Sequence, residues 1–399
     1  MLLCIWRSSA QSGFSIPPYQ RQVDIPFEYV NNFIILTLQF NRTLPLKFIL
    51  DTGAEHTIIS KREITDLLGV QYEREYRMKG ADLKTELIAY LVRRVRFEIP
   101  DKVVAPAVDI LVLQEDYFRF EEYAGIDVHG ILSASVFAKY YIKINYERRV
   151  ITLYERNSYR PAQAGFSEMP IELLRNKIYL NTRLQIRQDS TIDVKLLVDT
   201  GAGLSLLLFS NTDSLLRPPP DAIPSNIGMG LGGYLEGFIG RMQMLDLGKF
   251  SQKGIVTYFQ TLDTLLDAEH LNYRNGLIGN VLLNRFQVVF DYQGEAMWLK
   301  PAKNYNEEFV YDRSGLNVIA AGVNLNTFSI QSVLPNSPAA EADLRKGDVL
   351  LNVGRTPAVL MSLADIQRKF QKAAGKKVKV VVRRNGVRLK KEIVLRDLI

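Results

Sequence analysis

Apolar residues in the first three hundred positions come in short runs separated by turn residues, a pattern typical of β-strands. The run at residues 31–40 is followed by a turn at Asn41, and a second run at residues 44–50 leads directly into Asp51. This pattern predicts a hairpin whose second strand delivers Asp51 to a loop. A similar pattern at residues 141–154 predicts another hairpin.

Helix and turn signals interrupt the strands at a few places. Ser60 and Glu63 match a capping box, which predicts a short helix that ends at Gly69. Residues 70–100 alternate polar and apolar side chains, which predicts a hairpin with Gly80 near its tip.

The order of elements starts again after a polar linker at residues 156–168. An Asp-Thr-Gly-Ala sequence between two apolar strands occurs once in each half, and the two copies lie 148 positions apart. Gly130 and Gly276 lie 146 positions apart, as do Tyr146 and Tyr292 at the start of matching turns. A repeat that keeps its register in this way is an internal duplication.

The duplicated turns carry the candidate chemistry, which rests on Asp51 and Asp199. Two carboxyl groups within hydrogen-bond reach share one proton. One of them can act as a general base on a water molecule while the other donates a proton to a substrate carbonyl, which hydrolyses a peptide bond without a metal. We expect the turns to be shaped by the residues that follow each aspartate: Thr52, Gly53, Ala54, Thr200, Gly201 and Ala202.

On these residues, the region from about 25 to 300 resembles an aspartic protease with two lobes fused in one chain, and the turn at Asp51 is closest to the retroviral type. In that family each Asp-Thr-Gly strand passes beside a later strand that reads apolar-apolar-Gly. Residues 276–279 fit this pattern fully, whereas the corresponding strand of the first half ends in Ser133. The resemblance implies that Asp51 and Asp199 are the catalytic pair.

A glycine-rich segment at residues 228–237 predicts a flap over the cleft, with Gly230, Gly232 and Gly233 near its tip. Gly80 is the expected flap tip of the first half. A plain glycine-rich loop and a simple hairpin turn are the respective alternatives. The segment also matches a dinucleotide fingerprint, but no βαβ unit surrounds it, which argues against a nucleotide site.

The last ninety residues resemble a PDZ domain, mainly through residues 336–344 and 347–353. Within this part, Ser337 followed by Pro338 predicts the start of a helix, and Asn385-Gly386 predicts a hairpin turn. The resemblance implies peptide binding by strand addition. The loop expected to hold the carboxylate of a peptide C-terminus consists of Gly315, Leu316, Asn317 and Val318.

These observations predict a mainly β protein. We expect a two-lobed acid-protease β-barrel fold from an internal duplication, followed by a C-terminal α+β PDZ domain. The expected divisions are an N-terminal arm or signal-peptide remnant at 1–24, protease lobe 1 at 25–156, protease lobe 2 at 165–302 and the PDZ domain at 310–399. The order resembles that of bacterial aspartyl proteases with a C-terminal PDZ domain, which are usually exported.

The formal charge of +7 is unevenly distributed. Residues 311–399 contain 16 Lys and Arg against 7 Asp and Glu, whereas the rest of the chain contains 34 against 36. The first three hundred residues therefore give no indication of nucleic-acid binding. The basic run at residues 376–384 is interpreted as a solvated strand face, with attraction to acidic peptides or anionic membranes as the alternative.

One cysteine and three widely separated histidines predict no disulfide, no metal site and no cofactor. Residues 1–12 have a short apolar run followed by small residues, like the end of a secretory signal peptide that lacks its basic region. We therefore expect an exported protein, periplasmic or in the cell envelope, with a plain N-terminal arm as the alternative. No stretch approaches the ~20 apolar residues of a membrane span.

The sequence thus predicts an aspartic endopeptidase that cleaves peptide or protein substrates, with a PDZ domain that binds peptide or substrate termini. A monomer suffices because both halves lie in one chain. The alternatives are an inactive peptide-binding protein, favoured only by Ser133, and a scaffold that anchors partners through the PDZ domain. Ala54 and Ala202 replace the hydroxyl residues of pepsin-like enzymes, so we expect raised pKa values in the pair and activity at mildly acidic to neutral pH.

Overall fold

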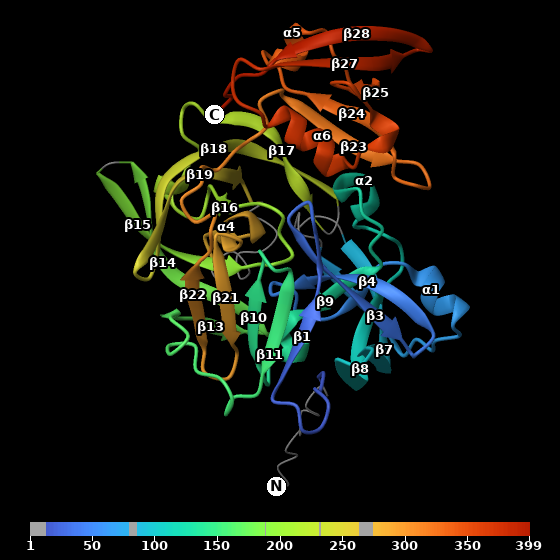
Figure 1. Ribbon diagram of the computed structural model, residues 1–399, viewed down its shortest axis with the longest axis vertical. Helices are drawn as coiled ribbons and strands as arrows, with labels where there is room; N and C mark the ends of the chain where they lie inside the picture. Colours follow the sequence, from blue (N-terminus) through green and yellow to red (C-terminus); the bar gives the residue numbers. More distant parts are fainter. Residues whose placement is uncertain (1–12, 80–85, 188, 231–232, 263–273) are drawn as a thin grey trace.

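The computed structural model describes residues 13–79, 86–187, 189–230, 233–262 and 274–399. Strands make up most of the first three hundred residues, and a separate smaller domain follows at one end of the molecule (Figure 1). The expected fold class, mainly β with two similar lobes and a C-terminal α+β domain, is confirmed.

Lobe 1 is an eight-stranded sheet with the order β2-β3-β4-β9-β5-β8-β7-β6. An extra pairing between β3 and β7 curls the sheet toward a barrel. Apolar side chains from both faces of its strands are buried, which is why the runs in this region read as nearly continuous hydrophobic segments. The strands are β2 (Glu28–Val30), β3 (Phe33–Phe40), β4 (Leu44–Asp51), β5 (Ile58–Ile59), β6 (Arg74–Lys79), β7 (Glu86–Ile99), β8 (Val103–Leu113) and β9 (Gly130–Ser133).

Lobe 2 repeats this arrangement with the order β13-β14-β15-β20-β16-β19-β18-β17 and the equivalent extra pairing between β14 and β18. Each strand of lobe 1 has a counterpart in the same place, as the repeated sequence predicts. The strands are β13 (Glu172–Leu174), β14 (Lys177–Arg187), β15 (Ser190–Val198), β16 (Leu206–Phe209), β17 (Ile223–Gly230), β18 (Gly233–Leu247), β19 (Phe250–Gln260) and β20 (Gly276–Ile278).

A six-stranded sheet joins the two lobes, with the order β1-β11-β10-β21-β22-β12. At its centre β10 of the first half pairs with β21 of the second, so that Lys143 lies opposite Val289. The buried residues of this sheet belong to the same hydrophobic core as both lobes. The strands are β1 (Gln22–Pro26), β10 (Tyr141–Asn145), β11 (Val150–Tyr154), β12 (Ser167–Pro170), β21 (Phe286–Asp291) and β22 (Ala296–Pro301).

The helices of the lobes are short: α1 (Arg62–Leu67), α2 (Phe120–Ala124), α4 (Asn280–Leu283) and the 3₁₀ turns η1 (Ala134–Phe137) and η2 (Ser214–Leu216). The predicted capping box at Ser60 is wrong, because α1 has Lys61 at its N-cap and no side-chain cap. Ser60 is buried and its N–H donates to the carbonyl of His129, which holds it beside the strands. The helix does end before Gly69, whose φ is +62°.

The C-terminal domain has its own core and a sheet with the order β23-β24-β25-β27-β28. As predicted, Ser337 caps α5 through its hydroxyl, and Asn385 and Gly386 form a turn with positive φ at both residues. The elements are β23 (Leu316–Ala321), β24 (Thr327–Val333), α5 (Pro338–Glu341), β25 (Val349–Val353), β26 (Thr356–Pro357), η3 (Ala358–Leu360), α6 (Leu363–Phe370), β27 (Lys377–Arg384) and β28 (Val387–Val394).

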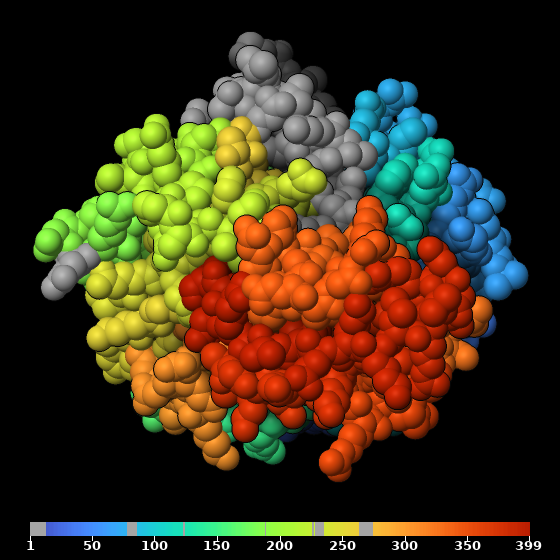
Figure 2. Space-filling model, turned by 90° about the horizontal axis from the view of Figure 1, so that it is seen from above, coloured from blue at the N-terminus to red at the C-terminus, as the bar shows by residue number. Residues whose placement is uncertain are grey.

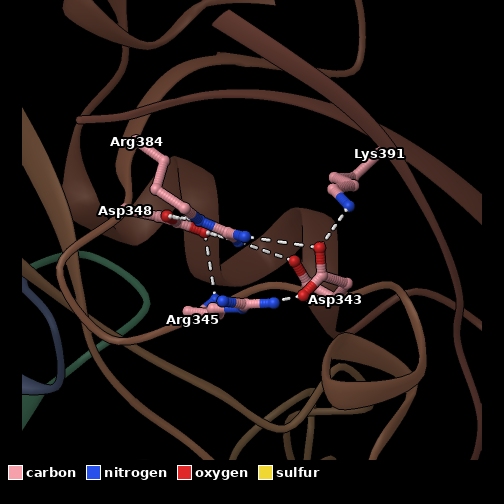
Figure 3. A network of polar contacts seen from close by, with 5 residues as sticks. All are labelled: Asp343, Arg345, Asp348, Arg384 and Lys391. Atoms are coloured by element: carbon pink, nitrogen blue, oxygen red, sulfur yellow. Dashed lines mark hydrogen bonds and ion pairs between the residues drawn. The ribbon is translucent and has the colours of Figure 1, made fainter. Parts of the chain in front are cut away.

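A polar network ties the outer strands of this domain to the turn after α5 (Figure 3). Arg384 on β27 binds the buried carboxylate of Asp348 through two hydrogen bonds of 2.7 and 2.8 Å. Arg384 and Lys391 also reach Asp343, and the N–H of Arg345 donates to Asp348. The buried charge is therefore fully paired, as a buried carboxylate must be.

The C-terminal domain touches both lobes, and Figures 1 and 2 show it lying over one end of the molecule. Helix α2 of lobe 1 packs against β23, where Gly125 approaches Leu363 at the start of α6. On the lobe 2 side, Arg241 of β18 donates to the carbonyls of Phe309 and Ile399. Across the described ranges, no helix is both long and apolar enough to span a membrane.

Candidate active site

The two Asp-Thr-Gly turns meet at the junction between the lobes. Strand β4 ends at Asp51 beside β9, and β15 ends just before Asp199 beside β20. A Cβ at Gly53 would lie 2.8 Å from Cγ of Asp199, and one at Gly201 would lie closer still to Asp51. Each glycine is therefore required by the carboxyl group of the opposite lobe.

The two carboxyl groups are hydrogen-bonded to each other and to their own turns. The N–H of Gly53 donates to Oδ1 of Asp51 at 2.6 Å, and the N–H of Gly201 donates to Oδ1 of Asp199 at 2.8 Å. A side-chain hydrogen bond joins Asp51 to Asp199. One proton between two carboxyl groups is the arrangement that such a contact needs.

Thr52 and Thr200 hold the turns together across the junction with symmetric contacts. The N–H of Thr52 donates to Oγ1 of Thr200 at 3.1 Å, and the N–H of Thr200 donates to Oγ1 of Thr52 at 3.0 Å. The hydroxyl of Thr52 then donates to the carbonyl of Val198, and that of Thr200 to the carbonyl of Leu50. Both threonines are fully buried, so these four bonds fix the separation of the aspartates.

Burial and mutual repulsion set the electrostatics of the pair. Burial, and then the nearby charge of Asp199, raises the pKa of Asp51 well above its usual value. Burial also raises the pKa of Asp199, although its hydrogen bond with Asp51 acts in the opposite direction. Asp51 is only 9% exposed, and Asp199 is more open to the cleft.

The residues after each turn differ in how they are supported. In lobe 2 the N–H of Asn280 donates to the carbonyl of Ala202 at 2.8 Å. In lobe 1 the hydroxyl of Ser133 donates to the carbonyl of Ala54, also at 2.8 Å. Ser133 thus supplies by its side chain the donor that lobe 2 takes from its backbone, and it does not displace the Asp51 turn.

A cleft of about 2090 Å³ opens over the two aspartates. It is lined by both lobes, by the hairpin of β17 and β18, by α2 and by the C-terminal domain. In that hairpin Gly230 pairs with Gly233, and the lining residues come from the strand portions before and after this tip. Gly232 and Gly80 lie outside the described residues, so the tips of the two predicted flaps remain predictions.

The predicted carboxylate loop of the PDZ-like part, residues 315–318, also lines this cleft. Its first donors are already in use, because Ser314 and Gly315 donate through their N–H groups to Asp312, and Leu316 donates to the hydroxyl of Ser314. Burial raises the pKa of Asp312 to about 6. Leu316, Asn317 and Val318 themselves form the start of β23.

Sequence reasoning missed several residues around the pair. Asn280 is buried, donates to the carbonyl of Thr200 at 2.5 Å and accepts from the hydroxyl of Tyr146 at 2.8 Å. Lys177 and Arg274 line the cleft on the lobe 2 side. These residues can be found by aligning the two halves, because each occupies a position at which the two copies differ.

Within the described residues, no group of three or more His, Cys, Asp or Glu side chains is arranged to hold a metal ion.

Comparisons with known proteins found matches to two family models. Residues 36–136 match the family model described as aspartyl protease, and residues 329–384 match the model described as PDZ domain. A comparison with curated proteins found no match. Among solved structures, the crystal structure of basic 7S globulin from soybean shares 10% identity at a TM-score of 0.42, covering 72% of this chain and 97% of its own. The chain thus combines an aspartyl protease domain with a C-terminal PDZ domain.

Proposed function

We propose that the chain is an aspartic endopeptidase in which Asp51 and Asp199 hydrolyse peptide bonds with a shared proton. The observation that carries the proposal is the hydrogen-bonded pair of carboxyl groups, which faces a cleft of about 2090 Å³ lined by both lobes. No other acidic pair among the described residues combines mutual hydrogen bonding with access to this cleft.

In the proposed reaction a water molecule lies between the two carboxyl groups. The ionised carboxylate takes one proton from the water, whose oxygen attacks the substrate carbonyl carbon, while the protonated carboxyl group gives its proton to the carbonyl oxygen. The resulting tetrahedral intermediate breaks its C–N bond as the amine leaves with the proton that the general base took from the water, and one hydroxyl of the intermediate returns a proton to the other carboxylate, which restores the shared-proton pair. The hydrogen bonds from Gly53 and Gly201 orient the carboxyl groups throughout.

The raised pKa values of both aspartates support activity above the strongly acidic range. Ala54 and Ala202 bring no hydroxyl to the carboxylates, and among the described residues Gly53 and Gly201 are the backbone donors to them. With few donors to stabilise the ionised form, burial dominates and the window in which the pair carries one proton moves upward in pH. We expect a rate maximum at mildly acidic to neutral pH.

The PDZ domain supports peptide binding, and we extend this to segments of the same substrate. Residues 315–318 of the PDZ domain and the aspartate pair line one continuous cleft. A polypeptide lying across the pair therefore has the start of β23 within the same groove.

A peptide digest tests the proposal. The full chain is incubated with a mixed library of random octamers at several pH values, and new termini are identified by mass spectrometry. We expect cleavage that Asp51→Asn and Asp199→Asn each reduce by at least about 10³-fold, because neither variant can form the shared-proton pair. Asp193→Asn is the matched control, since its exposed carboxylate lies on β15, the strand that leads to Asp199.

Two other results would contradict the proposal. Cleavage that persists in both aspartate variants would assign it to a contaminant or to another site. Absence of cleavage by the wild-type chain at every pH, together with retention of library peptides on the immobilised protein, would favour the inactive peptide-binding alternative.

A further inference from the structure

Two cationic side chains, Lys177 and Arg274, line the cleft beside Asp199. Lys177 is the first residue of β14, the strand that pairs with β15 so that Tyr179 lies opposite Leu197. Two residues further along this antiparallel register, Lys177 comes level with Asp199. The cation therefore sits on the strand adjacent to the aspartate, at the same height in the sheet.

Arg274 comes from the segment that enters β20, and its position is anchored by the next residue. The carbonyl of Asn275 accepts from the N–H of Phe209 at 2.8 Å, and the Asn275 side chain accepts from the N–H of Lys195 at 2.9 Å. The guanidinium of Arg274 lies 5.4 Å from the ring centroid of Phe209. A cation over an aromatic face leaves its edge free to bind an anion.

Neither cation has an acidic partner among the described residues. Other basic side chains at comparable depth do: Lys195 pairs with Glu172, and Arg156 pairs with Asp291. Burial lowers the pKa of Lys177 and of Arg274, which is the direction expected when no acid compensates the buried charge.

The acids that face these cations do not neutralise them. Asp51, Asp199 and Glu55 act on Lys177 at a distance, and Asp199 together with Tyr179 acts on Arg274. Glu55 lies 3.7 Å from His56, which carries a charge only when it is protonated, and the two aspartates carry one charge between them when they share a proton. These acids act on the two cations from a distance, and no described acid forms an ion pair with Lys177 or Arg274.

Lobe 1 has apolar residues at the matching positions. Phe33 begins β3 opposite the last residue of β2, as Lys177 begins β14 opposite the last residue of β13. Val128 precedes Gly130 by two residues, as Arg274 precedes Gly276. Phe33 packs edge-on against Phe120 in a fully apolar cluster. The charge is therefore a property of lobe 2 and not of the repeated scaffold.

We propose that Lys177 and Arg274 form a carboxylate-binding subsite that selects an acidic side chain, Glu or Asp, beside the scissile bond on the lobe 2 side of the cleft. The inference rests on the proposed peptidase function, because only a peptidase has a scissile bond. Its test includes a binding experiment that needs no hydrolysis. A substrate carboxylate supplies an acidic partner that none of the described residues provides, and the planar guanidinium of Arg274 can donate two parallel hydrogen bonds to it. On the lobe 1 side of the cleft, the substrate then places an apolar side chain.

The test compares charge preference in the wild-type chain and in Lys177→Met and Arg274→Met. Octamers cleaved by the wild type are resynthesised with Glu replaced by Gln, and each form is made with a free and with an amidated C-terminus. We expect the wild type to prefer Glu over Gln by about tenfold and each variant to lose most of that preference. Arg183→Met, an exposed cation further along β14, is the matched control and keeps it.

A binding experiment measures the preference for acidic octamers without hydrolysis. The same library is passed over immobilised Asp51→Asn protein, and the retained peptides are identified. Enrichment of acidic octamers that disappears in the Lys177→Met background supports the subsite even if no peptide is hydrolysed. Cleavage without any Glu preference, or a preference that survives in both variants, overturns the inference and leaves the peptidase proposal standing. A preference that depends on the free C-terminus and not on Glu would assign the cations to a terminal carboxylate and also overturns it.

Discussion

The two lobes place the same Asp-Thr-Gly turn on the same strand order, yet they support that turn with different atoms. In lobe 2 a backbone N–H, that of Asn280, donates to the carbonyl of Ala202, and in lobe 1 the hydroxyl of Ser133 donates to Ala54. The contacts that Thr52 and Thr200 make across the junction, in contrast, are symmetric. Symmetry is kept where the two aspartates must be held together, and it is lost one layer further out.

The difference at Ser133 has a steric counterpart at Gly279. A Cβ at Gly279 would lie 2.6 Å from the carbonyl oxygen of Ala202 and closer still to that of Leu204. Lobe 2 therefore has no room for a side chain at the position where lobe 1 holds Ser133. The two lobes therefore pack this position differently: lobe 1 uses Ser133 and lobe 2 uses Gly279.

The strongest way to break this comparison is to exchange the two residues. Gly279→Ser forces a side chain against two backbone oxygens, and we expect it to destabilise the fold by about 3–5 kcal/mol and to abolish peptide cleavage. Ser133→Gly removes two hydrogen bonds of the hydroxyl, to Ala54 and with Ser135, and we expect a loss of about 1–2 kcal/mol with cleavage retained within a few-fold. Denaturant unfolding and the peptide digest measure both.

Equal effects of the two exchanges would contradict this interpretation. If Ser133→Gly were as damaging as Gly279→Ser, Ser133 would have a role beyond donating to Ala54. If Ser133→Gly instead raised activity strongly, Ser133 would be a defect of the kind that the inactive alternative requires.

Much of this architecture can be predicted from the sequence because the duplication repeats each motif and its flanking apolar runs in a second copy. Asp51 and Asp199 stand out since each lies at nearly the same distance from a later apolar strand, and the strand order follows once the halves are aligned. Local turn chemistry was also sufficient at Ser337 and at Asn385, where a side-chain cap and a positive φ decide the structure without help from distant residues.

Prediction failed where distant contacts override a local pattern. Ser60 reads as a helix cap, but its backbone is held by His129, which is far away in sequence. Asp312 is a local contact instead, because its carboxylate accepts from the N–H groups of Ser314 and Gly315 only two and three positions later. Lys177 and Arg274 lie nearly a hundred positions apart, and only the sheet register brings both to the cleft.

The symmetric contacts predict matched effects. Thr52→Val and Thr200→Val each remove a hydroxyl that accepts from one buried N–H and donates to one buried carbonyl. We expect each to cost about 2–4 kcal/mol and to lower the rate of cleavage to a similar extent, because both loosen the same junction. Unfolding midpoints and steady-state rates measured side by side test this. A several-fold difference between the two variants would show that the junction is not symmetric in energy.

The buried tyrosines predict unmatched effects of smaller size. The hydroxyl of Tyr146 donates to Asn280, whereas the buried hydroxyl of Tyr292 has no hydrogen-bond partner among the described residues, and residue 134 of lobe 1, the counterpart of Asn280, is an alanine. Tyr146→Phe should cost about 1–3 kcal/mol because it strands the Asn280 oxygen, and Tyr292→Phe should be neutral or stabilising. Thermal unfolding of the two variants gives the answer. The reverse order would mean that a bound water molecule satisfies Tyr292.

The smallest expected effect is a shift of the pH profile, and it comes from Lys177, a charge near the pair that has no counterpart in lobe 1. The charge of Lys177 lowers the pKa values of both aspartates, against the larger effect of burial, which raises them. Cleavage needs one proton on the pair, so the rate falls at low pH when both carboxyl groups are protonated and at high pH when both are ionised. Removing the cation in Lys177→Met favours the protonated forms and should move both limbs of the pH profile to higher pH, whereas Lys177→Arg should leave them in place. Phe33→Met at the matching position of lobe 1 removes no charge and should change rates without moving either limb. A profile for Lys177→Met that keeps its position, or moves to lower pH, would show that this lysine does not act on the carboxyl groups in the free enzyme.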